Sequence, residues 1–447
     1  MIDPETLAGI AEDALTRARA AGADAADVLV IAHTHLAASQ RLGKPERSER
    51  AESFDLGLRV FDGKRMAMVA SSDHAPDALN ELAARAVAMA RVVPEDPFCG
   101  LADPDQLATE WPDLDLADLV EPAPDVLVAR AAAAEEAGLA VPGVTNSEGA
   151  EASYSRTTVA TAGTNGFRGS YALTSSSFYM SAIAGEGTAM ETDYEFSSAA
   201  HAEDLGDPAT VGRIAGERAV RRLGARKVES ARVPVVLDPR VAGGLVRSLL
   251  GAISGSAVAR GTSFLKDAMG TQILPEGLSI TDLPHLKRGR RSRPFDGEGL
   301  PSRAWNLVDQ GRLTTWLLDL RSARQLGLAP TGHGSRGAGS PPSPSASNVA
   351  LEGGSGSRED MLKAVGRGFY VTGLMGMGVN LVTGDYSRGA NGFWIEDGEL
   401  GDPVSEVTVA GNLKDMLRNL SAADDLERRY GIDSPTLRID GMTLAGQ

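Results

Sequence analysis

Apolar and polar positions follow two different periods along the chain, and they predict helices combined with antiparallel strands. Leu7, Ile10 and Leu15 recur at the spacing of one helix face, behind the capping residue Asp3. Residues 53–60 instead alternate polar and apolar side chains, which is the period of a strand with one buried face. The Asp62-Gly63 pair that follows is a turn signal, so this strand is predicted to form a hairpin with residues 66–70.

The same signals divide the chain into three parts. They predict further helices at residues 76–92, 124–138, 208–223 and from Pro239, strands at residues 26–36, within 144–196 and at 233–237, and hairpins at residues 305–318 and 393–409. We therefore predict an α+β fold with an N-terminal mixed α/β part, which contains antiparallel strands, and a C-terminal, glycine-rich, mainly β domain. The expected parts are an N-terminal subdomain (1–115), a middle subdomain of helices and antiparallel strands (116–228) and a β-rich domain (229–447).

Composition narrows the possible functions. Glycine accounts for 51 of 447 residues, so many turns and close backbone approaches are expected, and the Gly, Ser and Pro of residues 335–347 predict a loop or mobile flap. The formal net charge of −16 disfavours nucleic-acid binding, because phosphates repel an acidic surface. The N-terminus lacks the features of a signal peptide and no apolar run reaches the length of a membrane span, which predicts a cytoplasmic protein with no membrane partner.

Potential metal ligands are scarce. The single cysteine, Cys99, excludes an intrachain disulfide and a cysteine-based zinc site. None of the six histidines falls in an HExxH or HExxxH pattern. His33 and His35 would share one face of a strand, but without a third ligand nearby they are interpreted as a solvated or hydrogen-bonded pair rather than half of a metal site.

Three polar segments leave a structural and a functional interpretation open. The basic residues 287–293 are typical of an exposed loop or of a contact with phosphate or an acidic partner. Asp296 and Glu298 lie between glycines and suit a turn, acid–base chemistry or a hard cation. Asp385 and Arg388 suit a structural ion pair or substrate recognition.

The glycine-rich residues 373–378 resemble a phosphate loop only loosely. No Lys-Ser or Lys-Thr pair follows them, and no strand and helix frame them in the way a phosphate loop requires. Close approach of the backbone to a neighbouring segment or to an extended peptide explains these glycines better.

Several motifs, in a fixed order, resemble the TldD/PmbA family of metallopeptidase-related proteins. They are Asn146-Ser147-Glu148-Gly149-Ala150, Thr192-Asp193-Tyr194 with Ser197-Ser198, Gly261-Thr262-Ser263-Phe264-Leu265, residues 294–299, Leu317-Leu318-Asp319 with Ser322-Ala323-Arg324, residues 378–396, and Val404-Ser405-Glu406 with Ala410-Gly411-Asn412-Leu413. Each motif is weak alone, whereas the ordered set covers nearly the whole chain.

The resemblance further indicates one of the two branches of this family. The TldD branch carries an HExxxH segment on the helix that opens its C-terminal domain and a cysteine near its C-terminus, and the PmbA branch, also called TldE, lacks both. Here the matching helix places Arg247, Ser248, Gly251 and Ala252 in the region of that motif. Arginine stays protonated and alanine has no donor atom, so these residues form a degenerate zinc motif.

The resemblance therefore implies a non-catalytic TldE-like subunit of a TldD/TldE-type zinc metallopeptidase heterodimer that processes or degrades unfolded or extended peptides. No metal or other cofactor is expected in this chain, zinc is expected in the TldD-like partner, and a homodimer is possible when the partner is absent. The family-like segments supply candidate peptide-binding residues, namely Ser263, Phe264, Asp296, Glu298, Asn380, Asp385 and Arg388. The alternatives are a stand-alone homodimeric binding or regulatory protein and a peptide-tailoring hydrolase with an unrecognised site.

Overall fold

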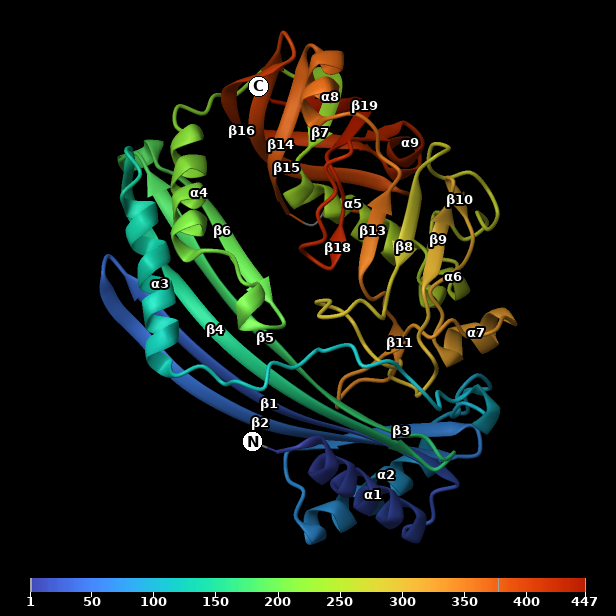
Figure 1. Cartoon of the computed structure of the whole chain (residues 1–447). Helices are drawn as coiled ribbons and strands as arrows, with labels where there is room; N and C mark the ends of the chain where they lie inside the picture. Colours follow the sequence, from blue (N-terminus) through green and yellow to red (C-terminus); the bar gives the residue numbers. More distant parts are fainter. Residues whose placement is uncertain (1, 377, 447) are drawn as a thin grey trace.

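A long N-terminal sheet and a C-terminal β domain face each other in the computed structural model, which describes residues 2–376 and 378–446 (Figure 1). The sheet has six antiparallel strands in the order β3-β2-β1-β4-β5-β6. Its strands are β1 (Ala25–Arg41), β2 (Lys44–Asp62), β3 (Arg65–Ser71), β4 (Val144–Gly163), β5 (Arg168–Ala184) and β6 (Glu191–Ala199). Because β1 pairs with both β2 and β4, the predicted segments 1–115 and 116–228 share this one sheet.

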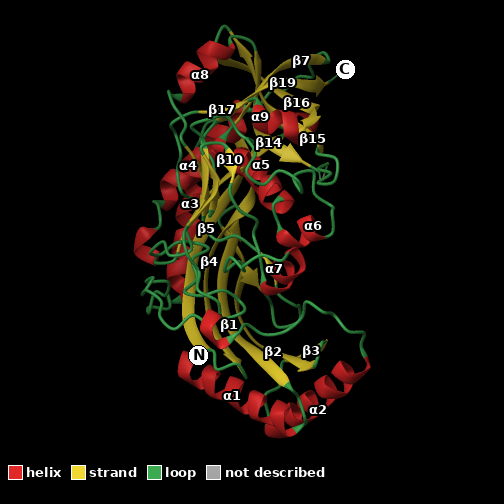
Figure 2. Ribbon diagram, turned by 90° about the vertical axis from the view of Figure 1, so that its right-hand side faces the viewer, coloured by secondary structure: helices red, strands yellow, loops and turns green. Residues whose placement is uncertain are grey.

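Four helices cover a single face of this sheet. They are α1 (Pro4–Ala20), α2 (Pro76–Val92), α3 (Pro124–Leu139) and α4 (Pro208–Arg221), and Figure 2 shows the first two at one end of the sheet. Val28 and Val30 of β1 pack with α1 and α2, and Leu36 and Ala38 pack with α3 and α4. Since these strand positions are an even number of residues apart, they point to the same face, and the opposite face is left toward the C-terminal domain.

The C-terminal domain contains a barrel-like sheet in the order β16-β15-β14-β7-β19-β17, which an additional β16–β19 pairing closes. These strands are β7 (Ala231–Leu237), β14 (Gly368–Met375), β15 (Asp385–Glu396), β16 (Glu399–Asn412), β17 (Leu420–Ala422) and β19 (Leu437–Ala445). The helix α5 (Pro239–Ala252) follows β7 directly, with the Asp238 side chain capping its first turn and Pro239 in the first helical position. The predicted α+β fold is therefore confirmed.

Shorter elements complete the C-terminal domain. A second sheet has the order β10-β9-β8-β13-β18. The remaining elements are α6 (Gly255–Ala259), β8 (Ser279–Asp282), β9 (Trp305–Asp309), β10 (Arg312–Leu313), α7 (Leu320–Leu326), β11 (Gly334–Ser335), β12 (Ser343–Pro344), β13 (Val349–Glu352), α8 (Arg358–Val365), α9 (Leu413–Arg418) and β18 (Ile432–Asp433). No helix of the described residues is long and apolar enough to cross a membrane.

Two predicted elements differ from the structure. The second strand of the hairpin at 305–318 ends at Leu313, because the chain then turns inward and Leu317 bridges to Ser254 beside α6. The segment 335–347 is mostly a loop, as predicted, but β11 pairs with β12 across it. It is also fixed at both ends, because the Arg336 side chain is fully buried and Ser347 bonds to Asp282. Nothing in these contacts supports a mobile flap.

Candidate functional site

A cavity of about 460 Å³ lies where the end of the N-terminal sheet meets α5 and the β14–β15 hairpin. Glu148, Asp193 and Tyr194 line it from the sheet, and Arg247 and Arg388 line it from the C-terminal domain. These residues come from family-like motifs that are far apart in sequence. We call this space the interdomain cavity.

Buried ion pairs hold the two sides of the cavity together. Arg240 at the start of α5 donates to Asp193 of β6 at 2.8 Å, and Arg222 approaches the same carboxylate at 3.6 Å and Glu191 at 3.1 Å. Burial opposes the charge on Arg240, but Asp193 and Asp238 raise its pKa above the usual value. The Arg240–Asp193 pair therefore joins the two halves of the chain at the cavity, and Arg222 supports the same carboxylate from the N-terminal half.

The degenerate zinc motif lies on α5, and only one of its side chains faces the cavity. Arg247 lines the cavity, Ser248 donates to the Gly244 carbonyl at 3.0 Å, Gly251 packs near Leu381, and Ala252 is fully buried. A guanidinium repels a divalent cation, and none of the four residues supplies an imidazole or carboxylate. These residues do not fit zinc.

The rest of the described chain does not assemble an alternative metal site. Among residues 2–376 and 378–446, no group of three or more His, Cys, Asp or Glu side chains is placed to hold an ion. His33 bonds through Nδ1 to the Thr157 hydroxyl at 2.9 Å, and its ring lies 6.3 Å from that of His35. Burial and the neighbouring His35 lower the pKa of His33, which favours the neutral imidazole.

Of the seven candidate peptide-binding residues, only Arg388 lines the interdomain cavity. Asn380 and Asp385 are exposed and stabilise the turn between β14 and β15: the Asn380 side chain accepts from Val382 N–H at 2.9 Å, and Asp385 accepts from the Thr383 hydroxyl at 2.6 Å. The predicted Asp385–Arg388 ion pair is not among the ion pairs of the described residues. Asp385 instead bonds to Asn412 at 3.2 Å.

Ser263 and Phe264 lie beside that turn rather than in the cavity. The Ser263 hydroxyl is buried and donates to the Ala252 carbonyl at 2.6 Å, and the Phe264 N–H donates to the Leu381 carbonyl at 2.8 Å. Phe264 also lines a separate pocket of about 320 Å³ with Lys414 and Arg418. Ser263 is therefore a structural residue that joins α5 to the following segment.

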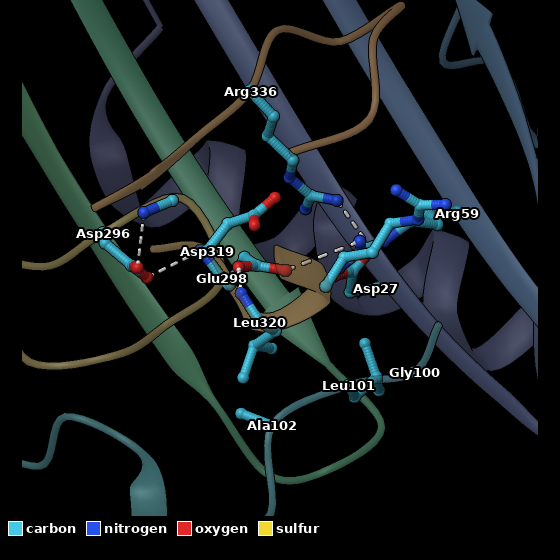
Figure 3. Close-up of polar contacts among 12 residues, drawn as sticks. Asp27, Arg59, Gly100, Leu101, Ala102, Asp296, Glu298, Asp319, Leu320 and Arg336 are labelled. Carbon is cyan, nitrogen blue, oxygen red and sulfur yellow. Dashed lines mark hydrogen bonds and ion pairs between the residues drawn. The ribbon is translucent and has the colours of Figure 1, made fainter. Parts of the chain in front are cut away.

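Asp296 and Glu298 belong to a buried polar network between the sheet and the C-terminal domain (Figure 3). Asp27 of β1 accepts from Arg59 at 2.5 and 3.0 Å and from Arg336 at 2.7 Å, and Arg59 approaches Glu298 at 3.8 Å. Burial favours the neutral form of Asp27, but Arg336 and Arg59 outweigh it and lower its pKa.

The two candidate carboxyls of this network bind main-chain groups. Asp296 accepts from Glu298, Leu300 and Gly334 N–H groups at 2.8–2.9 Å, and Glu298 accepts from Leu320 N–H at 2.8 Å. Burial raises the pKa of both groups, and nearby Asp296 helps to bring that of Glu298 to about 8. Both side chains are nearly inaccessible, which makes them interior supports of the loop rather than ligands for a peptide.

Parts of the basic and glycine-rich segments contact other parts of the chain. Arg288 pairs with Asp115 at 2.6 Å, and Arg291 donates to the Ser347 carbonyl at 3.0 Å. A side chain at Gly378 would overlap the Ser387 carbonyl, so this glycine allows a close approach within the protein; Met377 lies outside the described residues. Lys287, Arg288 and Arg290 also line a separate pocket of about 480 Å³ with Arg428 and Arg429.

Side chains occupy part of the edge strand β6, next to the cavity. The N–H groups of Tyr194 and Phe196 donate to the Asp193 and Glu195 side chains at 2.8 Å. Arg429 occupies the Phe196 carbonyl. A peptide in the cavity would therefore be recognised mainly by side chains.

Sequence reasoning missed Arg240, Gly244 and Thr372 as lining residues of the cavity. Arg240, Gly244 and Arg247 follow at the spacing of one helix face, within a helix whose other positions are mostly apolar. This stripe of one helix face could have identified Arg240 and Gly244 as lining residues from the sequence. Thr372 carries no such signal, because a strand rich in apolar residues and glycine surrounds it.

Comparison with known families assigns all three parts of the chain. The models of PmbA/TldA metallopeptidase domain 1, the central domain and the C-terminal domain match residues 26–90, 111–223 and 230–446. These matches place the chain, with its long sheet, its barrel and the degenerate zinc motif on α5, among the metallopeptidase-related proteins. The chain belongs to the PmbA/TldD family.

Individual relatives agree with this assignment. Metalloprotease PmbA of Escherichia coli O157:H7 is 39% identical over 95% of this chain and 93% of its own length, and the PmbA homologue of Haemophilus influenzae is 37% identical over 97% and 94%. A TldD homologue of Buchnera aphidicola is 26% identical over 51% of each chain.

Solved structures show the same fold. A candidate modulator of DNA gyrase from Bacteroides thetaiotaomicron superposes with a TM-score of 0.91 at 28% identity over 100% of both chains. TldE of Thermococcus kodakarensis reaches a TM-score of 0.86 at 21% identity over 98% of this chain and 100% of its own.

Proposed function

We propose that this chain is the non-catalytic, TldE-like subunit of a two-chain zinc metallopeptidase that acts on unfolded or extended peptides. The observation that carries the proposal is Arg247, a permanent cation on the α5 face that lines the interdomain cavity, in the region where the sister branch carries its zinc motif. The chain then contributes a wall of the peptide chamber, and its partner contributes the metal.

The proposal fixes the expected partners. A TldD-like subunit with an HExxxH helix holds the zinc, a peptide is the substrate, and the complex acts in the cytoplasm without nucleic acid or membrane. Processing of peptide precursors and degradation of labile proteins are the corresponding roles. A homodimer is the possible assembly when the partner is absent.

Co-expression with a TldD-like chain from the same genome tests the proposal. We expect a stable heterodimer with about one zinc per complex by elemental analysis, chelator-sensitive cleavage of an unfolded peptide by the complex, and neither zinc nor cleavage with this chain alone. A partner variant without its HExxxH histidines is the matched control and should assemble without cleaving. Stoichiometric zinc in the isolated chain, or cleavage by it, would contradict the proposal.

The alternative of an independent hydrolase finds little support in the acidic pair. Asp296 and Glu298 are buried and occupied by main-chain N–H groups. The same co-expression distinguishes the heterodimer from a stand-alone homodimer, because a stand-alone homodimer would form no complex with the TldD-like chain.

A further inference from the structure

Two of the arginines that line the interdomain cavity lack a carboxylate partner. Arg222 and Arg240 are paired with Glu191, Asp193 and Asp238. The ion pairs of the described residues include neither Arg247 nor Arg388. Arg388 contacts the Leu374 carbonyl through Nη2 at 3.5 Å and the side chain of Tyr386, and its Nε is buried without a hydrogen-bond acceptor.

A hydroxyl in the same wall is also unused. Thr372 lines the cavity, and its Oγ1 is buried without a hydrogen-bond partner. It lies where the pairing of β14 with β15 shifts register between Val371 and Gly373. An unpaired buried hydroxyl destabilises a fold unless a ligand or water satisfies it, so Thr372 and Arg388 together indicate a missing acceptor.

The cavity floor is kept open by a glycine that packing does not require. A Cβ at Gly244 would meet no atom within 4 Å. Glycine inside a helix costs about 0.5–1 kcal/mol relative to alanine, and no neighbouring atom here explains that cost. Its effect is to leave bare helix backbone between Arg240 and Arg247.

We propose that the interdomain cavity binds a carboxylate of an extended peptide, with Arg247 and Arg388 as its cations and Thr372 as a hydroxyl donor. The inference rests on the proposed peptide-processing function and names the group recognised. Two guanidiniums that no carboxylate neutralises attract an anion, whereas Glu148 and Asp193 in the same lining disfavour an anion with several charges. The carboxylate belongs either to the C-terminus of the peptide or to an acidic side chain, and the experiment separates these sources.

Three N-acetylated hexapeptides of Ala and Ser are the probes: one with a free C-terminal carboxylate, one with a C-terminal amide, and one amide with a central Glu. Each is titrated with the full chain, and binding is followed by NMR on the peptide resonances. We expect the free acid to bind about tenfold or more tightly than the plain amide, as loss of a charge-assisted contact predicts. Tighter binding of the free acid alone assigns the site to the C-terminus, and tighter binding of the Glu peptide than of the plain amide assigns it to acidic side chains. Equal affinity for all three probes, or no binding of any probe, overturns the inference.

Variants connect the binding to the named residues. Arg247→Gln and Arg388→Gln should each weaken binding of the preferred probe about tenfold, and Gly244→Leu should abolish it by filling the cavity. Arg85→Gln is the control and should bind as the unmodified chain does, because Arg85 is exposed on α2 and is not among the lining residues of the cavity. Unchanged affinity in both cavity arginine variants contradicts the inference.

Thr372→Val provides a readout that a purely structural role would not give. Removal of an unpaired buried hydroxyl should leave the midpoint of thermal unfolding unchanged or raised, while binding of the probe weakens. A lowered midpoint with unchanged binding would show that Thr372 serves the fold only. The inference and the proposed function fail separately, because zinc content and cleavage by the heterodimer do not depend on the outcome of these titrations.

Discussion

Asp27 is the carboxylate that neutralises two buried arginines. Its carboxylate accepts from two buried arginines, Arg59 and Arg336, which come from the sheet and from the 335–347 loop (Figure 3). A buried pair adds little net stability by itself, but removal of one partner leaves the other charges uncompensated. The role of Asp27 is therefore measured best by the change in the free energy of unfolding when its carboxylate is removed.

Asp27→Ala is expected to lower the free energy of unfolding by about 3–5 kcal/mol, because two desolvated guanidiniums lose their counter-charge. Urea unfolding followed by circular dichroism measures the change. The control is Asp13→Ala, which removes a half-exposed pair with Arg17 on α1 and should cost less than about 1 kcal/mol. Similar effects for both variants would contradict the assigned role.

Glu298 should make the stability of the protein depend on pH. Its pKa in the folded state is raised to about 8 from an ordinary value of 4.5. The unfolded chain therefore loses this proton first, so the contribution is complete below pH 4.5 and is lost as the pH rises toward 8. Glu298→Gln keeps an uncharged group there at every pH.

We expect this variant to match the unmodified chain near pH 5 and to gain on the order of 2–4 kcal/mol relative to it at pH 8.5. Urea unfolding at a series of pH values gives the comparison. Glu217→Gln, at an exposed position on α4, should leave the pH profile unchanged. A difference between Glu298→Gln and the unmodified chain that is constant with pH would refute the prediction.

Sequence patterns identified the notable polar residues but did not show which of them have a structural role and which line the cavity. The spacing of Asp296 and Glu298 marks a turn as well as a catalytic pair, and sequence carries no measure of burial, which is what decides here. Asn380 and Asp385 are likewise turn residues that the family motif contains for structural reasons. Arg247 was accessible to sequence reasoning because a change of charge type on a helix face is visible without coordinates.

At the scale of elements, the contact between α3 and α4 depends on small residues. A Cβ at Gly212 would overlap the Ala134 carbonyl, and one at Gly216 would lie 2.9 Å from the Gly138 carbonyl. The two helices thus approach at backbone distance over the sheet. The sequence predicted both helices, each of which begins at a proline, but not this approach, because the pairing of two helices is a tertiary property.

Gly212→Ala is expected to push α3 and α4 apart and to lower the free energy of unfolding by about 1–3 kcal/mol. The matched control is Gly9→Ala in the exposed interior of α1, where a Cβ meets nothing within 4 Å and should raise stability by about 0.5–1 kcal/mol. Urea unfolding of both variants checks the opposite signs. A stabilised Gly212→Ala would show that the helices are not in close contact.

Strand limits illustrate what a hydrophobic pattern can and cannot predict. The helix α2 has the predicted bounds, because its apolar face is continuous and proline marks its start. In contrast, β2 begins at Lys44, and its first ten residues are exposed and mostly charged or polar. They form a strand only because β1 supplies main-chain partners, so no side-chain periodicity signals it.

At the scale of the whole molecule, the two halves of the chain are joined where the 335–347 loop lies on the sheet. Gly57 of β2 is in contact with this loop, and a side chain there would overlap the Ala338 carbonyl. The Asp27–Arg336 pair and the Arg240–Asp193 pair link the same two halves at different points. We infer that the chain unfolds as one cooperative unit while this contact is intact.

Gly57→Leu should displace the loop and uncouple the two halves. Of the four tryptophans, Trp305, Trp316 and Trp394 belong to the C-terminal half, so tryptophan fluorescence mainly reports that half, whereas far-UV circular dichroism reports both. In the unmodified chain the two urea transitions should coincide, and in Gly57→Leu their midpoints should separate, because each half then unfolds with its own stability. The control is Ala51→Leu, which introduces the same side chain at an exposed site of the same strand and should keep the transitions coincident. Coincident transitions in Gly57→Leu would place the coupling elsewhere, in the ion pairs around Asp193 that also shape the interdomain cavity.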